Sequence, residues 1–114
     1  MADLFMLAER LQMRRDKALR AKFDELYKQE PNLIAYIIIK LEEAADQCRT
    51  HIQLLEDAVK QQTNNMDHFG GWWRLRKLLN DYFNHIPGIT STMECLKSPN
   101  ENTDDTYFLR ISFV

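Results

Sequence analysis

The stretch PNLIAYIIIKLEEAADQCRTHIQLLEDAVKQQ, residues 31 to 62, carries the strongest periodic pattern in the chain. It contains no glycine, and its single proline stands first, where a helix tolerates proline because the first N–H groups have no intrahelical partner. Apolar residues recur with heptad spacing and form a wide seam. The pattern predicts one continuous helix over residues 31 to 62, about 45 Å long at a rise of about 1.5 Å per residue. The seam positions that we expect in the core or in a dimer interface are Ile34, Ile37, Leu41, Cys48, Ile52 and Leu55.

Another long helix is expected before this stretch, because residues 3 to 29 contain no glycine or proline. Asp3 suits its N-cap. The helix should end just before Pro31, since the residue preceding a proline is disfavoured in helical geometry. Its apolar residues follow one broad stripe, which Arg15 and Lys22 interrupt. Long basic side chains at such positions are typical of the edge of a contact surface.

A third, shorter helix is predicted over residues 72 to 85. The polar segment before it, residues 61 to 71, ends in two glycines and indicates a linker. Pro87 and Gly88 are breakers that follow the helix. One face of this helix is apolar and the opposite face is polar, which is typical of a helix that packs on a core. The apolar face consists of Trp72, Leu75, Leu78, Leu79, Tyr82 and Phe83.

After Gly88 the hydrophobic period changes from about 3.6 to about 2, which indicates strands. The two strand candidates are ITSTMECLK, residues 89 to 97, and TYFLRISFV, residues 106 to 114. The polar loop between them, residues 98 to 105, predicts an antiparallel hairpin with a long tip. A lone hairpin is marginal in water, so it must pack on the helices or pair with another copy.

These elements predict a single α+β domain over residues 1 to 114, helical in residues 1 to 86 and with the β-hairpin in residues 87 to 114. The two long helices are expected to run antiparallel, with the third helix beside them. The third helix can cover only about half of the seam of the second, given a rise of about 1.5 Å per residue. A second copy could cover the remainder, which favours a homodimer built as a helical bundle or coiled coil.

Composition argues against several locations and partners. The net charge of −2 and the isoelectric point near 5.9 give no overall basic field, so nucleic acid would have to bind a local patch. Cys48 and Cys95 are too few for a disulfide framework, and no signal-peptide pattern opens the chain. The most apolar run, residues 33 to 41, is interrupted by Lys40 and is too short to cross a bilayer. We expect a cytoplasmic protein that does not enter a membrane.

The sequence contains no motif that predicts catalysis. Glycine-rich phosphate loops, the nucleophile elbow and the zinc-protease pattern are absent. Cys48 and His51 have a spacing that could place two metal ligands on one helix face, but a structural zinc site needs two more ligands and no second pair follows. A buried cysteine and a hydrogen-bonded histidine are the simpler interpretation. We therefore expect no enzymatic activity, no catalytic residues, no metal and no cofactor.

The segment HFGGWWRLRK, residues 68 to 77, is the first candidate for a binding surface. Trp72 belongs to the apolar face of the third helix. Trp73 is rotated by about 100° from it and should be partly exposed beside Lys77. Such a tryptophan can pack against the rest of the chain, anchor a protein contact or stack on a nucleobase.

The second candidate is the basic segment of residues 10 to 22, in which three cations share one exposed strip. The strip could contact phosphate or an acidic protein, or form ion pairs within the bundle. Together the two segments predict a non-catalytic protein–protein interaction module, a small adaptor, inhibitor or regulatory subunit whose protein partner carries acidic groups. The alternative is a nucleic-acid-binding regulator that uses the same strip and the third helix. The expected contact residues are Trp73, Arg74, Lys77, Arg10, Arg14 and Lys17.

Overall fold

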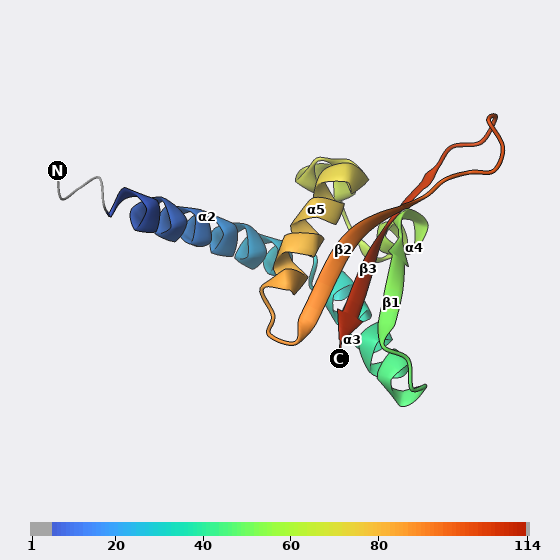
Figure 1. The fold of residues 1–114 in the computed structure, drawn as a ribbon, viewed down its shortest axis with the longest axis horizontal. Coiled ribbons are helices and arrows are strands. Elements are labelled where there is room, and N and C mark those ends of the chain that lie inside the picture. Colours follow the sequence, from blue (N-terminus) through green and yellow to red (C-terminus); the bar gives the residue numbers. More distant parts are fainter. Residues whose placement is uncertain (1–5, 114) are drawn as a thin grey trace.

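The computed structural model describes residues 6 to 113, and its fold belongs to the predicted α+β class (Figure 1). Helices and strands alternate through the middle of the chain, and two strands end it. The elements are α2 (Leu7–Gln29), α3 (Pro31–Asp46), β1 (His51–Leu55), α4 (Glu56–Gln62), the 3-10 helix η1 (Met66–Phe69), α5 (Gly71–Asn84), β2 (Ile89–Leu96) and β3 (Thr106–Phe113).

The three strands form an antiparallel sheet in which β3 is central and β1 and β2 are the edges. The hairpin of β2 and β3 is confirmed, with bounds within one residue of the predicted ones. In the register, Leu54 of β1 and Met93 of β2 both lie opposite Leu109 of β3. The hairpin tip extends well beyond the rest of the sheet (Figure 1).

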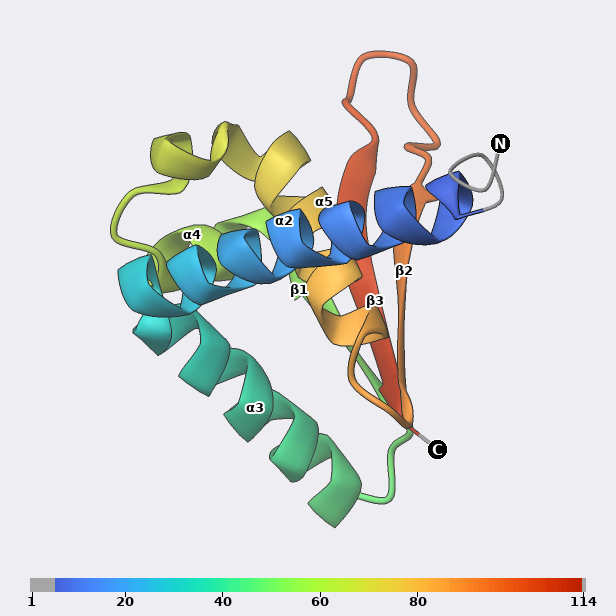
Figure 2. The same cartoon turned by 90° about the vertical axis from the view of Figure 1, so that its left-hand side faces the viewer.

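The core lies between the helices and one face of the sheet. In Figure 2, α3 and α4 lie on one side of the strands, and α5 lies between α2 and the sheet. Side chains that alternate along β1 and β3 supply one half of this core, and the apolar faces of the helices supply the other half. The buried cluster consists of Leu26, Leu33, Ile34, Ile37, Leu54, Val59, Trp72, Leu75, Leu79, Phe83, Leu109 and Ile111.

Residues 31 to 62 do not form one helix, so this prediction was wrong. Helix α3 ends at Asp46, residues 51 to 55 form β1, and α4 is a separate short helix. Ile52 and Leu54 alternate with the polar residues His51 and Gln53 and lie opposite the core residues of β3. A short apolar run fits either a helical or a strand period, and the pairing with β3 decides between them.

A tight turn with one left-handed residue ends α3. The N–H of Arg49 donates to the carbonyl of Ala44 at 2.8 Å, and the N–H of Cys48 donates to the carbonyl of Ala45 at 3.0 Å. Cys48 has φ of 60°, a conformation that is uncommon for residues other than glycine. Turns of this kind usually carry glycine at the left-handed position. Because no glycine stands here, nothing in the sequence marks the end of α3.

The expected seam is divided by this turn. Ile34 and Ile37 are buried in α3, and Leu41 is partly buried. Ile52 packs partly against the core, but it does so from β1. Cys48 lies exposed in the turn, and Leu55 lies exposed at the end of β1. These two residues are therefore not part of a helical seam.

The first long helix, α2, ends at Gln29 just before Pro31, as predicted. The expected start at residue 3 and the cap at Asp3 lie outside the described residues. Helices α2 and α3 run in opposite senses but diverge from their junction (Figure 2). The first turns of α2 project away from the rest of the molecule (Figure 1).

The junction of α2 and α3 is held by the buried carboxylate of Glu30, which is 1% exposed. Its two oxygens accept hydrogen bonds from the backbone N–H of Asn64, at 3.0 and 2.8 Å, and from that of Asn65 at 3.0 Å. A buried carboxylate is tolerated when backbone donors satisfy it in this way. Glu30 thereby fixes the segment after α4 to the junction of the first two helices.

The Glu30→Gln substitution should lower the free energy of unfolding by about 1 to 3 kcal/mol, because the amide replaces one acceptor oxygen by a donor that faces backbone N–H groups. Urea unfolding followed by circular dichroism measures this change. Glu42→Gln is the matched control, since Glu42 is an exposed glutamate of α3. Equal unfolding midpoints for the two variants would contradict the role assigned to Glu30.

Candidate functional site

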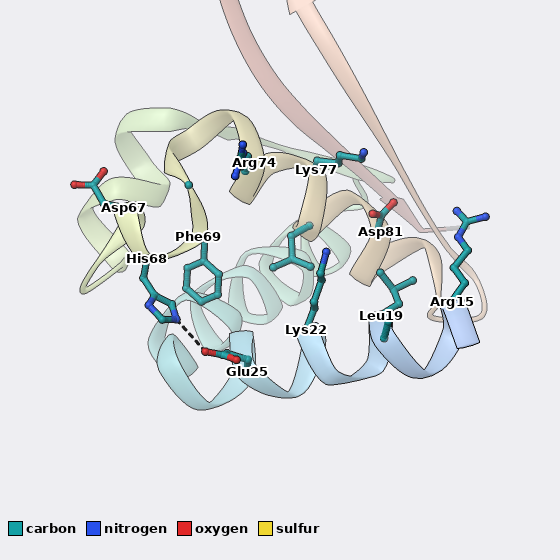
Figure 3. A pocket seen from close by; sticks show the side chains of 13 residues that line it. Arg15, Leu19, Lys22, Glu25, Asp67, His68, Phe69, Arg74, Lys77 and Asp81 are labelled. Carbon is teal, nitrogen blue, oxygen red and sulfur yellow. Dashed lines mark hydrogen bonds and ion pairs between the residues drawn. The ribbon is translucent and has the colours of Figure 1, made fainter. Parts of the chain in front are cut away.

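A groove runs between α2, η1 and α5 and encloses about 1040 Å³ (Figure 3). One wall comes from α2 and the other from α5, while η1 closes one end. The residues that line it are Arg15, Ala18, Leu19, Lys22, Glu25, Asp67, His68, Phe69, Gly70, Arg74, Lys77, Leu78 and Asp81. We call this feature the basic groove.

The α5 wall is positioned by the packing of the opposite face of that helix. Leu75, Leu79 and Phe83 are buried in the core, so the helix cannot rotate without exposing them. Arg74 and Lys77 then line the basic groove from α5 (Figure 3).

Two polar side chains also fasten α5 to the hairpin. Asn84 pairs with the backbone of Ser91 on the edge strand β2, donating to its carbonyl at 2.9 Å and accepting from its N–H at 2.7 Å. Arg76 donates to the carbonyls of Phe108 at 3.0 Å and of Glu94 at 2.7 Å. The helix is therefore tied to both strands of the hairpin, and the Asn84 amide satisfies backbone groups that an edge strand would otherwise leave open.

Gly70 is required where η1 meets α5. It has φ of +86°, and a Cβ at this position would lie 2.4 Å from Cδ of Arg74. Glycine is the residue that adopts this conformation without steric cost. The absence of a side chain here lets Arg74 lie close to the backbone at the edge of the basic groove.

The α2 wall uses residues of one helix face at spacings of four and three, namely Arg15, Leu19 and Lys22. The helix is held in place by Phe23, whose ring packs edge-on against Tyr82 with 5.2 Å between centroids. The same ring contacts His85 at 5.4 Å. These contacts lie near the C-terminal end of α5, so α2 crosses that helix and leaves the basic groove open beside it.

One end of the basic groove is bridged by a hydrogen-bond contact between η1 and α2. His68 Nε2 lies 3.0 Å from Glu25 Oε1, and both side chains are about half exposed (Figure 3). Exposed pairs of this kind contribute little to stability, roughly 0 to 1 kcal/mol. The contact directs the Glu25 carboxylate toward His68 at this end of the basic groove (Figure 3).

The basic groove combines apolar lining residues with a rim on which four cations face three acids, Glu25, Asp67 and Asp81. Leu19, Phe69 and Leu78 are partly buried residues of the floor. The rim carries four cations on two helices, and Asp81 lies among them near Lys77 and Arg15 (Figure 3). This arrangement suits an amphipathic protein segment that carries acidic groups, since the floor can bury apolar side chains and the rim can pair with carboxylates. The four cations are Arg15, Lys22, Arg74 and Lys77.

The structure divides the predicted contact residues into three groups. Arg74 and Lys77 line the basic groove. Arg10, Arg14 and Lys17 are exposed on α2 but do not line it. Trp73 lies on the other flank of α5, where its ring packs edge-on against Tyr107.

Sequence reasoning missed Arg15 and Lys22 as contact residues. Their signal was present, because these are the two cations that interrupt the apolar stripe of α2. A cation on a stripe stands at the edge of a packed surface, and here that edge is the opening of the basic groove.

The two tryptophans differ in exposure, as predicted. Trp72 is buried and its Nε1 donates to the carbonyl of Tyr107 at 3.1 Å, whereas Trp73 is 62% exposed. Arg76 was not predicted to be buried. It is 6% exposed, and its guanidinium lies under the rings of Trp73 and Tyr107, 5.5 and 5.6 Å from their centroids. We call Trp73, Arg76 and Tyr107 the aromatic patch.

Across residues 6 to 113, no three histidine, cysteine or acidic side chains gather as a metal site would require. Cys48 and His51 do not share a helix, because one lies in the turn and the other in β1. His51 Nε2 instead lies 3.3 Å from a guanidinium nitrogen of Arg110 on β3. In the same range, no helix combines the length and the apolar character needed to cross a bilayer.

Comparison of the chain with protein-family models, with curated proteins and with solved structures finds no match. The function is therefore argued from the geometry of this molecule.

Proposed function

We propose that this protein is a non-catalytic protein–protein interaction module, a small adaptor, inhibitor or regulatory subunit that binds an acidic segment of its partner in the basic groove. The observation that supports it is the convergence of Arg15 and Lys22 from α2 with Arg74 and Lys77 from α5 over an apolar floor. Cations of opposite walls can contact the same bound segment. The cations would steer the acidic segment toward the basic groove, and the apolar floor would bury apolar side chains of that segment.

Nucleic acid is the alternative partner, since the same four cations could contact phosphates. The acids of the basic groove favour the protein partner. Asp81 lies between the cations of the two walls, and Asp67 also lines the groove (Figure 3). A phosphate backbone would be repelled by these carboxylates, whereas a protein segment can offer donors to them.

A homodimer belongs to the same proposal, but on a different basis from the one predicted. The broad seam of a long second helix no longer supports it, because α3 ends at Asp46. The start of α2 now provides the argument, since Leu7, Leu11 and Met13 are exposed on a helix that projects from the molecule (Figure 1). A second copy could cover these side chains.

Light scattering after size-exclusion chromatography tests the dimer. The unchanged protein should have the mass of two chains, and Leu11→Glu should have the mass of one, because a charge would be buried in the apolar contact. The exposed polar neighbour Gln12 provides the control variant Gln12→Glu, which adds a charge next to that contact and should leave the mass of the dimer unchanged. A monomeric unchanged protein would refute the dimer and leave the basic groove proposal standing.

A cytoplasmic location is also part of the proposal. Cys48 and Cys95 are exposed and unpaired, which suits a reducing compartment. Cell fractionation that recovers the protein from an oxidising compartment would contradict it.

The basic groove is tested with a labelled peptide that carries leucine on one helical face and glutamate on the other. The Arg74→Glu and Lys77→Glu double variant should bind this peptide about tenfold more weakly, because two attractive charges become repulsive. The matched control is the double variant Arg14→Glu and Lys17→Glu, which makes the same change in net charge on α2 outside the basic groove. Fluorescence anisotropy measures the affinities.

Duplex and single-stranded DNA serve as the second arm of the same titration. Peptide binding that both double variants weaken equally would show only a nonspecific charge effect and would refute the groove site. Tighter binding of DNA than of peptide, with an affinity that falls steeply as salt increases, would refute the protein-partner proposal in favour of nucleic acid.

A further inference from the structure

Arg76 is a buried cation that has no acidic partner among residues 6 to 113. Its side chain is 6% exposed, and both of its hydrogen bonds go to backbone carbonyls of the hairpin. The acidic contacts of Lys40, His68 and Arg110 do not involve Arg76. Buried charges are usually paired, because removing a charge from water is costly. The lack of a counter-charge is therefore a feature that needs a physical explanation.

One edge of the planar guanidinium donates hydrogen bonds to backbone carbonyls, and its other edge makes no hydrogen bond within residues 6 to 113. The bonds to Phe108 and Glu94 come from Nε and Nη2, which form the side edge of the planar group. The remaining end edge presents one N–H of Nη1 and one of Nη2, the geometry that binds the two oxygens of a carboxylate.

This free edge remains accessible to solvent. Among the described residues, the buried side-chain atoms that are both sealed from solvent and without a hydrogen bond are Asn80 Oδ1 and Ser91 Oγ. The nitrogens of Arg76 are not in this group, although Nη1 makes no hydrogen bond within the described part of the chain. Nη1 is therefore not fully sealed, although the residue as a whole is 6% exposed.

Two aromatic rings border the guanidinium. The centroids of Trp73 and Tyr107 lie 5.5 and 5.6 Å from its central carbon, and the rings meet edge to face at 4.8 Å. Both rings are exposed, Trp73 by 62% and Tyr107 by 38%. Exposed tryptophan and tyrosine beside an arginine are the residue types that dominate binding energy at protein interfaces.

The charge states of the aromatic patch also favour an incoming anion. Burial lowers the pKa of Arg76, but an arginine remains protonated in proteins, so the site keeps its positive charge. The neighbouring Cys95, which also hydrogen-bonds to the phenol, raises the pKa of Tyr107, so no phenolate forms at neutral pH to compete with an incoming anion.

We propose that the aromatic patch is a carboxylate-binding site, in which the free edge of Arg76 holds a partner's carboxylate beside the contacting rings of Trp73 and Tyr107. The carboxylate can belong to an aspartate or glutamate side chain or to a chain end. The site uses neither Arg74 nor Lys77 and is therefore a second contact, independent of the basic groove.

A carboxylate fits the aromatic patch better than a phosphate does. Arg76 is its single cation, which matches the charge of a monoanion. Asp105 lies close enough to contribute to the raised pKa of Tyr107, and the Glu94 carbonyl already accepts a bond from Arg76. A phosphate dianion usually needs a cluster of cations and would be repelled by the acid nearby.

Nuclear magnetic resonance titration of the labelled protein tests the site. The probes are acetyl-tetraglutamate amide, a tetra-alanine with a free C-terminus, and inorganic phosphate. Acetyl-tetraglutamine amide is the uncharged control. We expect saturable shifts of the Arg76 Nε–H and Trp73 Nε1–H signals with one or both carboxylate probes, and the stronger of these probes identifies the source of the carboxylate. Saturation by phosphate at lower concentration, or equal shifts with the glutamine control, would overturn the proposal.

Two variants leave the backbone bonds of Arg76 intact. Tyr107→Phe removes only the hydroxyl, and Trp73→Ala removes an exposed ring that limits the access of water to the guanidinium. Each should weaken binding of the carboxylate probe several-fold, and Arg76→Lys should weaken it by about tenfold, because it removes the forked edge. If Arg76→Lys does not fold, the first two variants decide.

Arg74→Gln is the matched control, because it removes a cation from the same helix but on the flank of the basic groove. Unchanged affinity in both Tyr107→Phe and Trp73→Ala, or a larger loss in Arg74→Gln, would overturn the carboxylate site. The result is separate from the groove titration, which depends on Arg74 and Lys77 and would still support or refute the basic groove by itself.

Discussion

The pairing of residues 51 to 55 with β3 is the constraint on which the rest of the structure depends. It turns a two-stranded hairpin, which is marginal in water, into a three-stranded sheet with β3 in the centre. It also brings Ile52 and Leu54 against Ile111 and Leu109, so that one face of the sheet becomes continuous with the core. The end of α3 follows from it, because the chain must turn back at Cys48 to reach the edge of the sheet.

Helix α5 connects this core to both proposed binding surfaces. One face of α5 is buried by Leu75, Leu79 and Phe83, and this burial fixes its rotation. One flank then presents Arg74 to α2 across the basic groove, and the other places Trp73 over the hairpin. Trp73 and Arg74 therefore belong to different proposed surfaces, although they are adjacent in the sequence. A partner that contacts both flanks would have to span the N-terminal half of α5.

Sequence reasoning succeeded where local signals are strong. The proline after α2 and the change of period after Gly88 predicted the end of a helix and the hairpin, and the apolar face of residues 72 to 85 predicted α5. It failed at residues 47 to 55, because a heptad pattern persists there while the helix ends, and α4 begins as a separate helix at Glu56. The end depends on a left-handed residue that is not glycine and on pairing with a strand more than 50 positions later, and neither leaves a local trace.

The candidate site was predictable only in part for a related reason. Arg74 and Lys77 were identified, because their position opposite the apolar face of α5 follows from helical periodicity. Which cations of α2 would face them depends on the crossing of the two helices, and this is set by the contact of Phe23 with Tyr82. The burial of Arg76 depends on carbonyls of the hairpin in the same way. Tertiary contacts of this kind are not encoded in the spacing of residues along one helix.

Nuclear Overhauser measurements on residues 47 to 62 test the central claim most directly. The structure predicts contacts across the strands between Leu54 and Leu109 and between Ile52 and Ile111, with slow amide exchange in β1. Helical contacts between residues three apart, continuing without a break from Asp46 through residue 55, would contradict the account.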